Sequence, residues 1–311
     1  MSVDFETDTF DQLVRGVCPV LEIPFRPDAT VDDSGFSAVV EHVLGTGVSA
    51  IFWPGFASEF HKISDVERLR LRTLLLEQTL HRSDVSVIVG VAQHATHLAI
   101  EDAVSAVDAG ASVINLLPPH FLNPSKSSVL GHIRSVLSAV DPVPVIVQHA
   151  PSLAPSRLAA TDLCALANDH SNLRMIKVES VPPGSFIAAL KAGRPALPAM
   201  VGFAGVMMID ALRRGAVGVQ PGCSSVEIYL AIWQLWDDGR TDEAEALHRR
   251  LLPFISYWMQ EVELIIQVEK TISKERGLID HDHCRAPGRE LDAEERLMIR
   301  RFLTEFEDFL G

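Results

Sequence analysis

One lysine, Lys177, stands at the end of a short apolar stretch that begins at Leu173. A lysine in that position often runs along apolar surface and extends its amine to water. An amine held in an apolar pocket is instead less readily protonated, because burial disfavours charge, and it can attack a carbonyl carbon. Lys177 is therefore a candidate nucleophile for Schiff-base chemistry.

Polar residues also end other apolar stretches of the chain. They are residues 55–59, Gln93, His94, Pro119, His120, Gln148, His149, Glu179 and Gln220. In one interpretation, Lys177 forms a Schiff base with a keto acid, and the iminium serves as an electron sink for making or breaking the adjacent carbon–carbon bond. Backbone N–H groups of residues 55–59 then hold the substrate carboxylate, since such a turn presents successive donors.

A second interpretation is a metal site. In it, three histidines bind a divalent ion and a glutamate is the fourth ligand; the candidates are His94, His120 and His149 with Glu59 or Glu179. The three histidines lack a fixed short spacing such as H-x-H. Residues 281–284, with the sequence His-Asp-His-Cys, have a metal-like composition, but their polar surroundings favour a solvated loop.

The elements that position these residues alternate regularly. Eight apolar stretches, about 30 residues apart, are each followed by a helical pattern; they are residues 17–23, 48–53, 85–89, 112–117, 143–148, 173–177, 197–201 and 217–220. Continuous apolar runs are typical of parallel strands covered on both faces. Eight βα units in about 220 residues predict an α/β fold, a (βα)8 TIM barrel. A doubly wound sheet is the alternative, but no G-x-G-x-x-G motif follows the first stretch to support a dinucleotide site.

The pattern predicts three segments: a leader over residues 1–15, the barrel over residues 16–224, and a C-terminal helical domain over residues 225–311. Helices are expected there over residues 226–237, 241–276 and 292–310. Apolar residues such as Phe254 and Trp258 predict that these helices pack on the barrel or on another subunit.

Composition narrows the classes of function. The net charge of −14 disfavours a nucleic-acid partner. No apolar run reaches 18 residues, which argues against a membrane span. The four cysteines form no C-x-x-C pair and are expected to be reduced thiols in a cytoplasmic protein.

Four motifs occur in a fixed order: Pro24-Phe25 with Val31-Asp32, residues 55–59 with residues 63–68, Ile176-Lys177, and residues 215–219. In this order they resemble the dihydrodipicolinate synthase/N-acetylneuraminate lyase superfamily of pyruvate-dependent class I aldolases, over nearly the whole chain. The resemblance implies a (βα)8 barrel with a C-terminal helical domain, usually a homotetramer. It also implies Lys177 as the Schiff-base lysine, with no cofactor and no metal.

The chain departs from the family pattern around the expected site. Phe56 and Ala57 replace two threonines, and Gln148 replaces the tyrosine that relays protons. Pro119 and His120 stand where the family has a tyrosine pair, and the arginine that binds the second substrate of true synthases would lie near Leu153.

The resemblance assigns carboxylate binding to the backbone around Ala57 and Ser58, within a loop that includes Gly55 and Phe56, and a backbone carbonyl to Gln220. Proton transfer and specificity then fall to His120, Gln148 or His149, because imidazole titrates near the working pH and can replace the phenol.

The predicted function is a Schiff-base-forming lyase, of aldolase or hydratase type, acting on pyruvate or a longer 2-oxo acid. The expected partner is this small molecule, with no nucleic acid and no membrane, and the protein is expected to be a cytoplasmic homo-oligomer, a dimer or tetramer. Three alternatives remain at this point: a true 4-hydroxy-tetrahydrodipicolinate synthase, a metal-dependent TIM-barrel enzyme, and a non-catalytic member of the superfamily.

Overall fold

The computed structural model describes residues 14–119, 121–151 and 158–311. Its sheet has eight strands in the order β1-β8-β7-β6-β5-β4-β3-β2. The strands are β1 Gly16–Val17, β2 Ala50–Trp53, β3 Ser86–Val91, β4 Val113–Leu116, β5 Val145–His149, β6 Leu173–Val178, β7 Ala199–Val201 and β8 Gly218–Val219.

Helices follow the strands in the expected alternation. They are α2 Asp33–Gly45, α3 Asp65–Thr79, α4 Thr96–Asp108, α5 Lys126–Val140, α6 Ala160–Asp169, α7 Gly184–Lys191, α8 Met208–Arg213 and α9 Val226–Asp237. The predicted (βα)8 barrel is confirmed. The first strand is shorter than expected. Pro19 has no N–H to donate, and over residues 18–23 the ladder is reduced to the isolated bridges of Val20 to Phe52 and Gly222.

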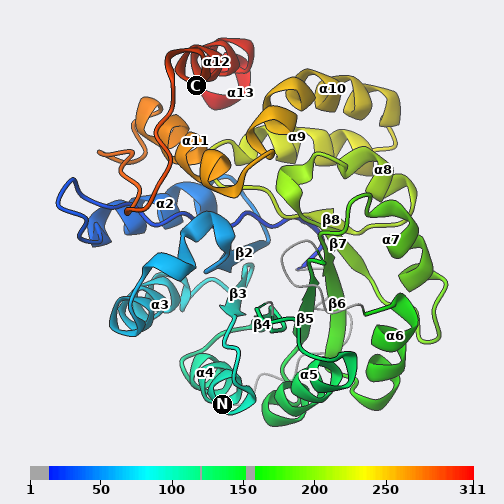
Figure 1. Ribbon diagram of the computed structural model, residues 1–311. Coiled ribbons are helices and arrows are strands. Elements are labelled where there is room, and N and C mark those ends of the chain that lie inside the picture. The colour runs from blue at the N-terminus through cyan, green and yellow to red at the C-terminus, as the bar shows by residue number, and fades with distance from the viewer. Residues whose placement is uncertain (1–13, 120, 152–157) are drawn as a thin grey trace. The chain divides into compact units, whose positions relative to one another are not determined.

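The chain divides into two compact units, which are described separately. Ser83–Phe203 and Met207–Val219 form the body of the first, and Gly16–Arg82, Ala204–Val206 and Gln220–Gly311 form the second. Within the first unit, β3 to β8 pair in parallel, and α4 to α8 lie on their outer side (Figure 1). The predicted boundary at residue 224 stays a prediction.

The strands of the first unit are buried along almost their whole length, as the apolar runs predict. Ile88, Ile114, Ile146, Ile176 and Met200, one from each of β3 to β7, are fully buried. The parallel register sets Gln148 opposite Lys177, and Lys177 opposite Met200. Polar side chains inside such strands are therefore held by packing on both sides.

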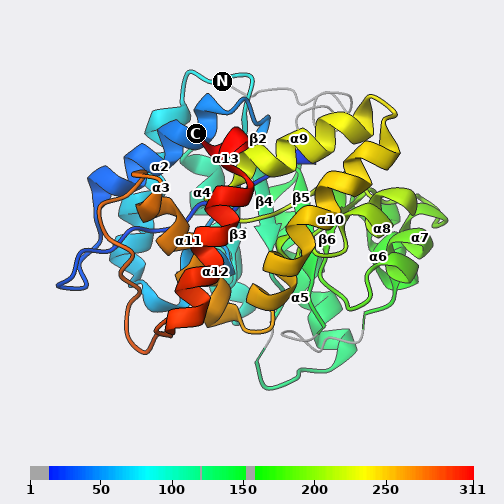
Figure 2. The ribbon, with the colours of Figure 1, turned by 90° about the horizontal axis from the view of Figure 1, so that it is seen from above.

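The second unit ends in helices α10 Thr241–Trp258, α11 Val262–Glu275, α12 Ala293–Glu305 and α13 Glu307–Leu310. The expected single helix over residues 241–276 is wrong: α10 ends at Trp258, and α11 begins at Val262, after Glu261, which has extended backbone angles. Neither Gly nor Pro marks that turn. Figure 2 shows α12 running beside α11, and Trp258 packs edge-on against Phe302 at 5.2 Å. Within the described residues, every helix is too short or too polar to cross a membrane.

Candidate active site

Lys177 lies one residue before the end of β6 and is buried, with 4% of its side chain exposed. Side chains alternate along a strand, so residues 177 and 179 project to the same face. The Lys177 Nζ lies 3.4 Å from Oε1 of Glu179. A lysine and a carboxylate therefore share one buried position at the carboxyl end of β6, the end at which barrels of this kind carry their chemistry.

Glu179 is the residue that the predicted catalytic set lacks. Its backbone N–H donates to the carbonyl of His149 at 2.8 Å and continues the β5–β6 ladder past the end of β6. This bond holds the residue in extended geometry, and its side chain is nine-tenths buried. The available signal was the spacing of two residues from Lys177, which places both side chains on one face.

Gln148 connects this carboxylate to the neighbouring strands. Its Nε2 donates to Oε2 of Glu179 at 2.6 Å, and its Oε1 accepts from Nδ2 of Asn115 at 3.0 Å. Asn115 on β4 was not predicted, although it interrupts the otherwise apolar run of that strand. The predicted Gln148 is thus next to the lysine's partner, as a donor to the carboxylate.

His149 ends β5 and is 6% exposed. Its ring stacks on Phe186 of α7, with centroids 4.0 Å apart and an angle of 5° between the planes. Burial lowers the pKa of His149 to about 4, so the imidazole is neutral at pH 7. The expectation of a histidine titrating near neutral pH does not hold for His149, and His120 lies outside the described residues.

The histidine set of the metal hypothesis is not assembled in the described part of the chain. No group of three His, Cys, Asp or Glu residues is positioned there to hold a metal ion. His94 lies against the ring of Phe121, at 5.9 Å between centroids. Glu59, a proposed fourth ligand, is paired with lysines instead.

The loop after β2 belongs to the second unit and begins at Gly55, before the short helix η1 Phe56–Ser58. A Cβ at Gly55 would lie 2.8 Å from Val20 and 2.9 Å from Phe52, which explains the glycine. The Ser58 hydroxyl is fully buried; it donates to the carbonyl of Leu21 at 2.5 Å and accepts from the N–H of Gly55 at 3.0 Å. Ser58 therefore shapes the loop from inside.

The backbone of this loop is partly committed as well. The N–H of Ser58 donates to the carbonyl of Gly55 at 2.9 Å, and the N–H of Glu59 donates to that of Phe56 at 3.0 Å. Phe56 and Ala57 are half-buried, and the Phe56 ring packs on Phe60 at 5.2 Å. Among the residues predicted to bind a carboxylate, Ala57 is thus a better candidate than Ser58.

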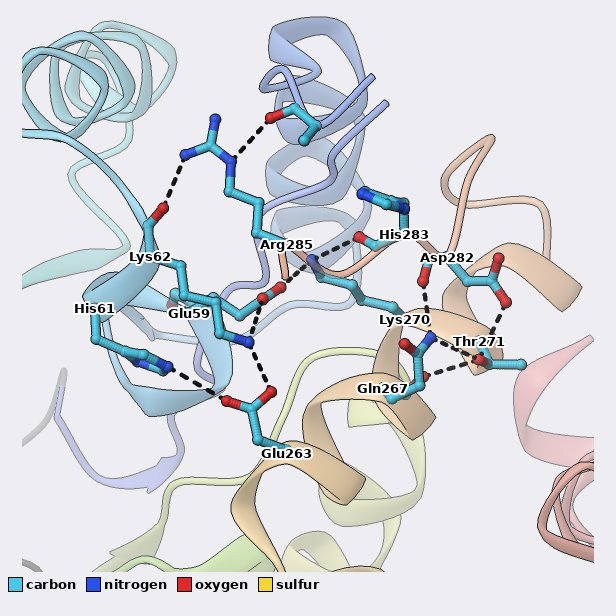
Figure 3. Close-up of polar contacts among 12 residues, drawn as sticks. Glu59, His61, Lys62, Glu263, Gln267, Lys270, Thr271, Asp282, His283 and Arg285 are labelled. Atoms are coloured by element: carbon cyan, nitrogen blue, oxygen red, sulfur yellow. Dashed lines mark hydrogen bonds and ion pairs between the residues drawn. The ribbon is translucent and has the colours of Figure 1, made fainter. Parts of the chain in front are cut away.

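Glu59 anchors the loop in a buried polar network, shown in Figure 3. It forms an ion pair with Lys270 of α11 in which neither side chain is exposed, and a second with Lys62 at 3.1 Å. Lys62 also pairs with Glu263 at 2.6 Å. The Nζ of Lys270 donates in addition to the carbonyl of His283 at 3.1 Å. The loop is thereby fixed to α11.

Residues 281–284 form a loop, as expected, in which His281 is exposed and Asp282, His283 and Cys284 are half-buried. Asp282 accepts from Lys274 at 2.9 Å, and its backbone carbonyl accepts from Gln267 at 2.8 Å. Arg285 donates to Glu67 and to the carbonyl of Lys62. The polar residues of this loop therefore form hydrogen bonds and ion pairs with other segments of the second unit.

Gln220, the last predicted binding residue, follows β8 and is 2% exposed. Its Nε2 lies 3.6 Å from the sulfur of Cys18. Its Oε1 is buried without a hydrogen-bond partner in the described part of the protein. The side chain is therefore packed inside the second unit.

Comparison with known proteins gives a consistent result. The model of the dihydrodipicolinate synthetase family matches residues 13–306. A 4-hydroxy-tetrahydrodipicolinate synthase from Methanothrix thermoacetophila is 27% identical over 303 residues, covering 96% of this chain and 99% of that protein. A putative 2-dehydro-3-deoxy-D-gluconate aldolase, YagE, from Escherichia coli is 22% identical, covering 95% and 98%.

Solved structures share the fold. A dihydrodipicolinate synthase from Rhodopseudomonas palustris has a TM-score of 0.86 at 23% identity, with 94% of this chain and 98% of that one covered. The structure of YagE from E. coli in complex with pyruvate has a TM-score of 0.85 at 23% identity, with 95% and 99% covered.

Proposed function

The chain belongs to the dihydrodipicolinate synthetase family, and on that premise we propose that Lys177 forms a Schiff base with the carbonyl carbon of pyruvate or a longer 2-keto acid. The prediction of a lyase of the class I aldolase type is confirmed by the family and its named members. The observation that carries the assignment of Lys177 is the buried lysine on β6, with a carboxylate 3.4 Å from its amine.

In the first step, the neutral amine of Lys177 attacks the keto carbon, water leaves, and a protonated imine remains. Glu179, whose carboxylate lies 3.4 Å from Nζ, first takes one proton from the ammonium form of Lys177 and later returns it to the hydroxyl of the tetrahedral adduct, which leaves as water. The second proton that the nitrogen loses passes to the former keto oxygen. The positive imine is then stabilised by the same carboxylate.

In the second step, a base removes a proton from the carbon next to the imine carbon and leaves an enamine, which reacts with a second carbonyl or loses a group. We assign this role to Glu179. Gln148 cannot exchange protons at neutral pH, but its N–H supports the carboxylate at 2.6 Å. We propose that His149, neutral and stacked on Phe186, offers an apolar ring face to the substrate, which would favour an apolar or aromatic tail.

The remaining predicted contacts rest on the motifs. We propose that the backbone of Gly55, Phe56 and Ala57 binds the substrate carboxylate and that Ser58 holds the turn in shape. A role for the backbone carbonyl of Gln220, and for His120 as a second proton-transfer group, is proposed on the resemblance alone.

We also propose, from the resemblance, that the protein is a homo-oligomer, either a dimer or a tetramer, and that it is cytoplasmic. Residues 225–311 are proposed to form a C-terminal helical domain. The free thiols of Cys18, Cys164, Cys223 and Cys284 support a reducing compartment. Size-exclusion chromatography with light scattering measures the oligomeric state.

The deciding experiment is borohydride trapping with pyruvate, followed by digestion and mass spectrometry. The expected result is a reduced adduct on the peptide that contains Lys177, no adduct in Lys177→Ala, and an unchanged adduct in Lys191→Ala, since Lys191 is exposed on α7. An adduct on another lysine, or none with pyruvate and longer 2-keto acids, overturns the assignment.

A second candidate is favoured by the 27% identity to a 4-hydroxy-tetrahydrodipicolinate synthase. Incubation of the trapping-competent enzyme with pyruvate and aspartate semialdehyde tests it. Condensation at the rate of other aldehydes or faster supports the synthase; turnover with 2-dehydro-3-deoxy-D-gluconate alone supports an aldolase like the one named for YagE.

A further inference from the structure

Three buried side chains on three adjacent strands form a hydrogen-bonded line that ends at the lysine's partner. Asn115 on β4 donates to Gln148 on β5 at 3.0 Å, and Gln148 donates to Glu179 after β6 at 2.6 Å. Their exposed fractions are 1%, 4% and 9%. The second carboxylate oxygen of Glu179, Oε1, lies 3.4 Å from Nζ of Lys177.

The direction of this line follows from chemistry alone. An ionised carboxylate only accepts hydrogen bonds, so Gln148 must present its N–H to Glu179. The oxygen of the same amide then faces Asn115, which must present its own N–H. The two amide dipoles are therefore aligned head to tail and point their positive ends at the carboxylate, an arrangement in which each bond strengthens the next.

Asn115 supports this direction by donating its N–H to the Gln148 oxygen at 3.0 Å. The Gln148 amide has two orientations, and the alternative one sets its oxygen against an oxygen of Glu179, which disfavours the ionised carboxylate. With its own amide oriented as in the structure, Asn115 opposes that turn, because its N–H would then face an N–H. The Oδ1 of Asn115 is buried without a hydrogen-bond partner in the described part of the protein. Its neighbours on β4 are Val113, Ile114 and Leu116, and a polar group among apolar residues is costly to bury unless it is bonded.

We propose that Asn115 is a positioning residue of the reaction: by fixing the Gln148 amide, it keeps a hydrogen-bond donor on the carboxylate of Glu179 and aims that carboxylate at Lys177. This inference rests on the proposed function, in which Glu179 moves the protons. Asn115 itself is separated from the lysine by two side chains.

The groups that face Glu179 within the first unit are few. Within the described residues of the first unit, the side chain of Glu179 contacts Lys177 on its own strand, Gln148 on β5 and the position of Gly202 after β7. Its backbone N–H donates to the carbonyl of His149. Lys177 is the charged one among them. A change in how the carboxylate titrates on mutation of Asn115 is therefore attributable to the amide line.

The test separates Schiff-base formation from proton transfer. Borohydride trapping with pyruvate, measured as the final yield of adduct, reports how much imine forms and not the rate of its proton steps. Exchange of the pyruvate methyl hydrogens for solvent deuterium, followed by NMR, reports the rate of proton transfer. In Asn115→Leu, trapping is expected to stay within about twofold of the unmodified protein, while exchange at pH 7 falls about three- to tenfold, as for loss of one hydrogen bond. The acid limb of the exchange profile is expected to move to higher pH by roughly half to one unit.

A double variant shows that Asn115 acts through Gln148. Gln148→Met removes the donor to the carboxylate and is expected to reduce exchange about ten- to a hundredfold, since a bond to a charge is lost. Asn115→Leu added to Gln148→Met is expected to change nothing further, because interacting residues are not additive. Two independent, multiplying losses overturn the proposal.

Asn172 supplies the matched control. It is equally buried in the same unit, and its amide donates to the backbone carbonyls of Leu137 and Val143, away from Glu179. Asn172→Leu is expected to lower stability but to leave the acid limb in place. If Asn115→Leu does not fold, Asn115→Ser is measured instead.

A readout without turnover keeps the two hypotheses apart. If the unmodified protein traps no keto acid, the proposed function fails, yet Asn115 is still tested by ¹³C NMR of carboxyl-labelled glutamate, with Glu179→Gln identifying the signal. A higher titration midpoint for Glu179 in the Asn115 variant supports the positioning role. An unmoved midpoint, or an unmoved acid limb in an exchanging enzyme, overturns it.

Discussion

The carboxylate of Glu179 occupies the space that a side chain at Gly202 would need. A Cβ built on Gly202 overlaps Oε1, Cγ and Cδ of Glu179. Gly202 follows β7, and its N–H donates to the carbonyl of Val178 at 3.1 Å, so its backbone cannot move away without breaking the ladder. The glycine is required here by the close approach of the carboxylate.

Gly202→Ala should therefore displace Glu179 and impair proton transfer. We expect deuterium exchange into pyruvate to fall at least about tenfold while trapping on Lys177 persists, with a stability loss of about 1–3 kcal/mol from overpacking. Quenched exchange kinetics and urea unfolding measure the two effects. Gly131→Ala is the control, because Gly131 lies in α5 with open space around it; it should leave exchange unchanged. If Gly202→Ala exchanges deuterium at the rate of the unmodified protein, the position of the Glu179 carboxylate beside Gly202 is not needed for proton transfer.

The sequence predicts much of the barrel because parallel strands with both faces covered are continuous apolar runs. Such a run can be recognised in the sequence without knowing which strand it pairs with. The expected helix over residues 226–237 matches α9. Lys177 is predicted as the nucleophile from a local feature, because a charged residue stands at the end of such a run. The turn after Trp258 was missed, since no residue there has a strong preference for breaking a helix.

The rest depends on contacts that one sequence does not display. Asn115 and Gln148 are 33 positions apart, and their bond follows from the register of β4 with β5. Glu59 and Lys270 are 211 positions apart. The neutral state of His149 depends on its burial against Phe186. Spacing alone places Glu179 on the same face as Lys177, because side chains alternate along a strand.

The burial of His149 makes the folding stability of the protein fall in acid. Burial lowers its pKa to about 4 in the fold, whereas an unfolded histidine titrates near about 6.5. Between these values the unfolded chain binds more protons, so the contribution is complete above about pH 6.5 and is lost as the pH falls towards 4. Its size is about 3 kcal/mol.

His149→Gln should therefore flatten the acid side of the stability profile. Urea midpoints measured from pH 4 to pH 8 should fall less steeply below pH 6.5 in the variant. We also expect the pH profile of deuterium exchange between pH 6 and 8 to keep its shape. A new or lost limb in that range would assign proton transfer to His149 instead of Glu179.

Glu22 has the opposite dependence on pH. Burial raises the pKa of its carboxyl to about 7, and the neighbouring charge of Glu269 adds to the shift. Because the folded state holds this proton more tightly than the unfolded chain, stability is greatest below about pH 4.5 and falls as the pH rises to 7. The penalty above pH 7 is on the order of 3 kcal/mol.

Glu22→Gln keeps the size of the side chain and removes the charge. The variant should be more stable than the unmodified protein at pH 8, and the two should be similar at pH 5. Denaturant unfolding at both pH values measures this difference. A variant that is destabilised equally at both would show that the carboxylate is bonded favourably in its ionised form.

The buried ion pair of Glu59 with Lys270 should contribute more to folding stability than an ion pair on the surface does. Neither side chain is exposed, and Lys270 also lies over the ring of Phe25, 4.2 Å from its centroid. Lys270→Met leaves the Glu59 charge buried with Lys62 as its remaining cation, and removal of one partner from a buried pair costs about 3–5 kcal/mol. Urea unfolding at pH 7 is the measurement.

The double variant Glu59→Gln/Lys270→Met separates the charge from the packing. It should be less destabilised than Lys270→Met alone, because no uncompensated carboxylate remains beside the substituted position on α11 and Lys62 keeps Glu263 as a partner. Arg240→Met is the matched control: its pair with Glu243 is exposed and screened by water, so the unfolding midpoint should not move. If the double variant is as unstable as the sum of the two single ones, the pair acts through side-chain packing, and its charge contributes nothing to holding the loop of Gly55 on α11.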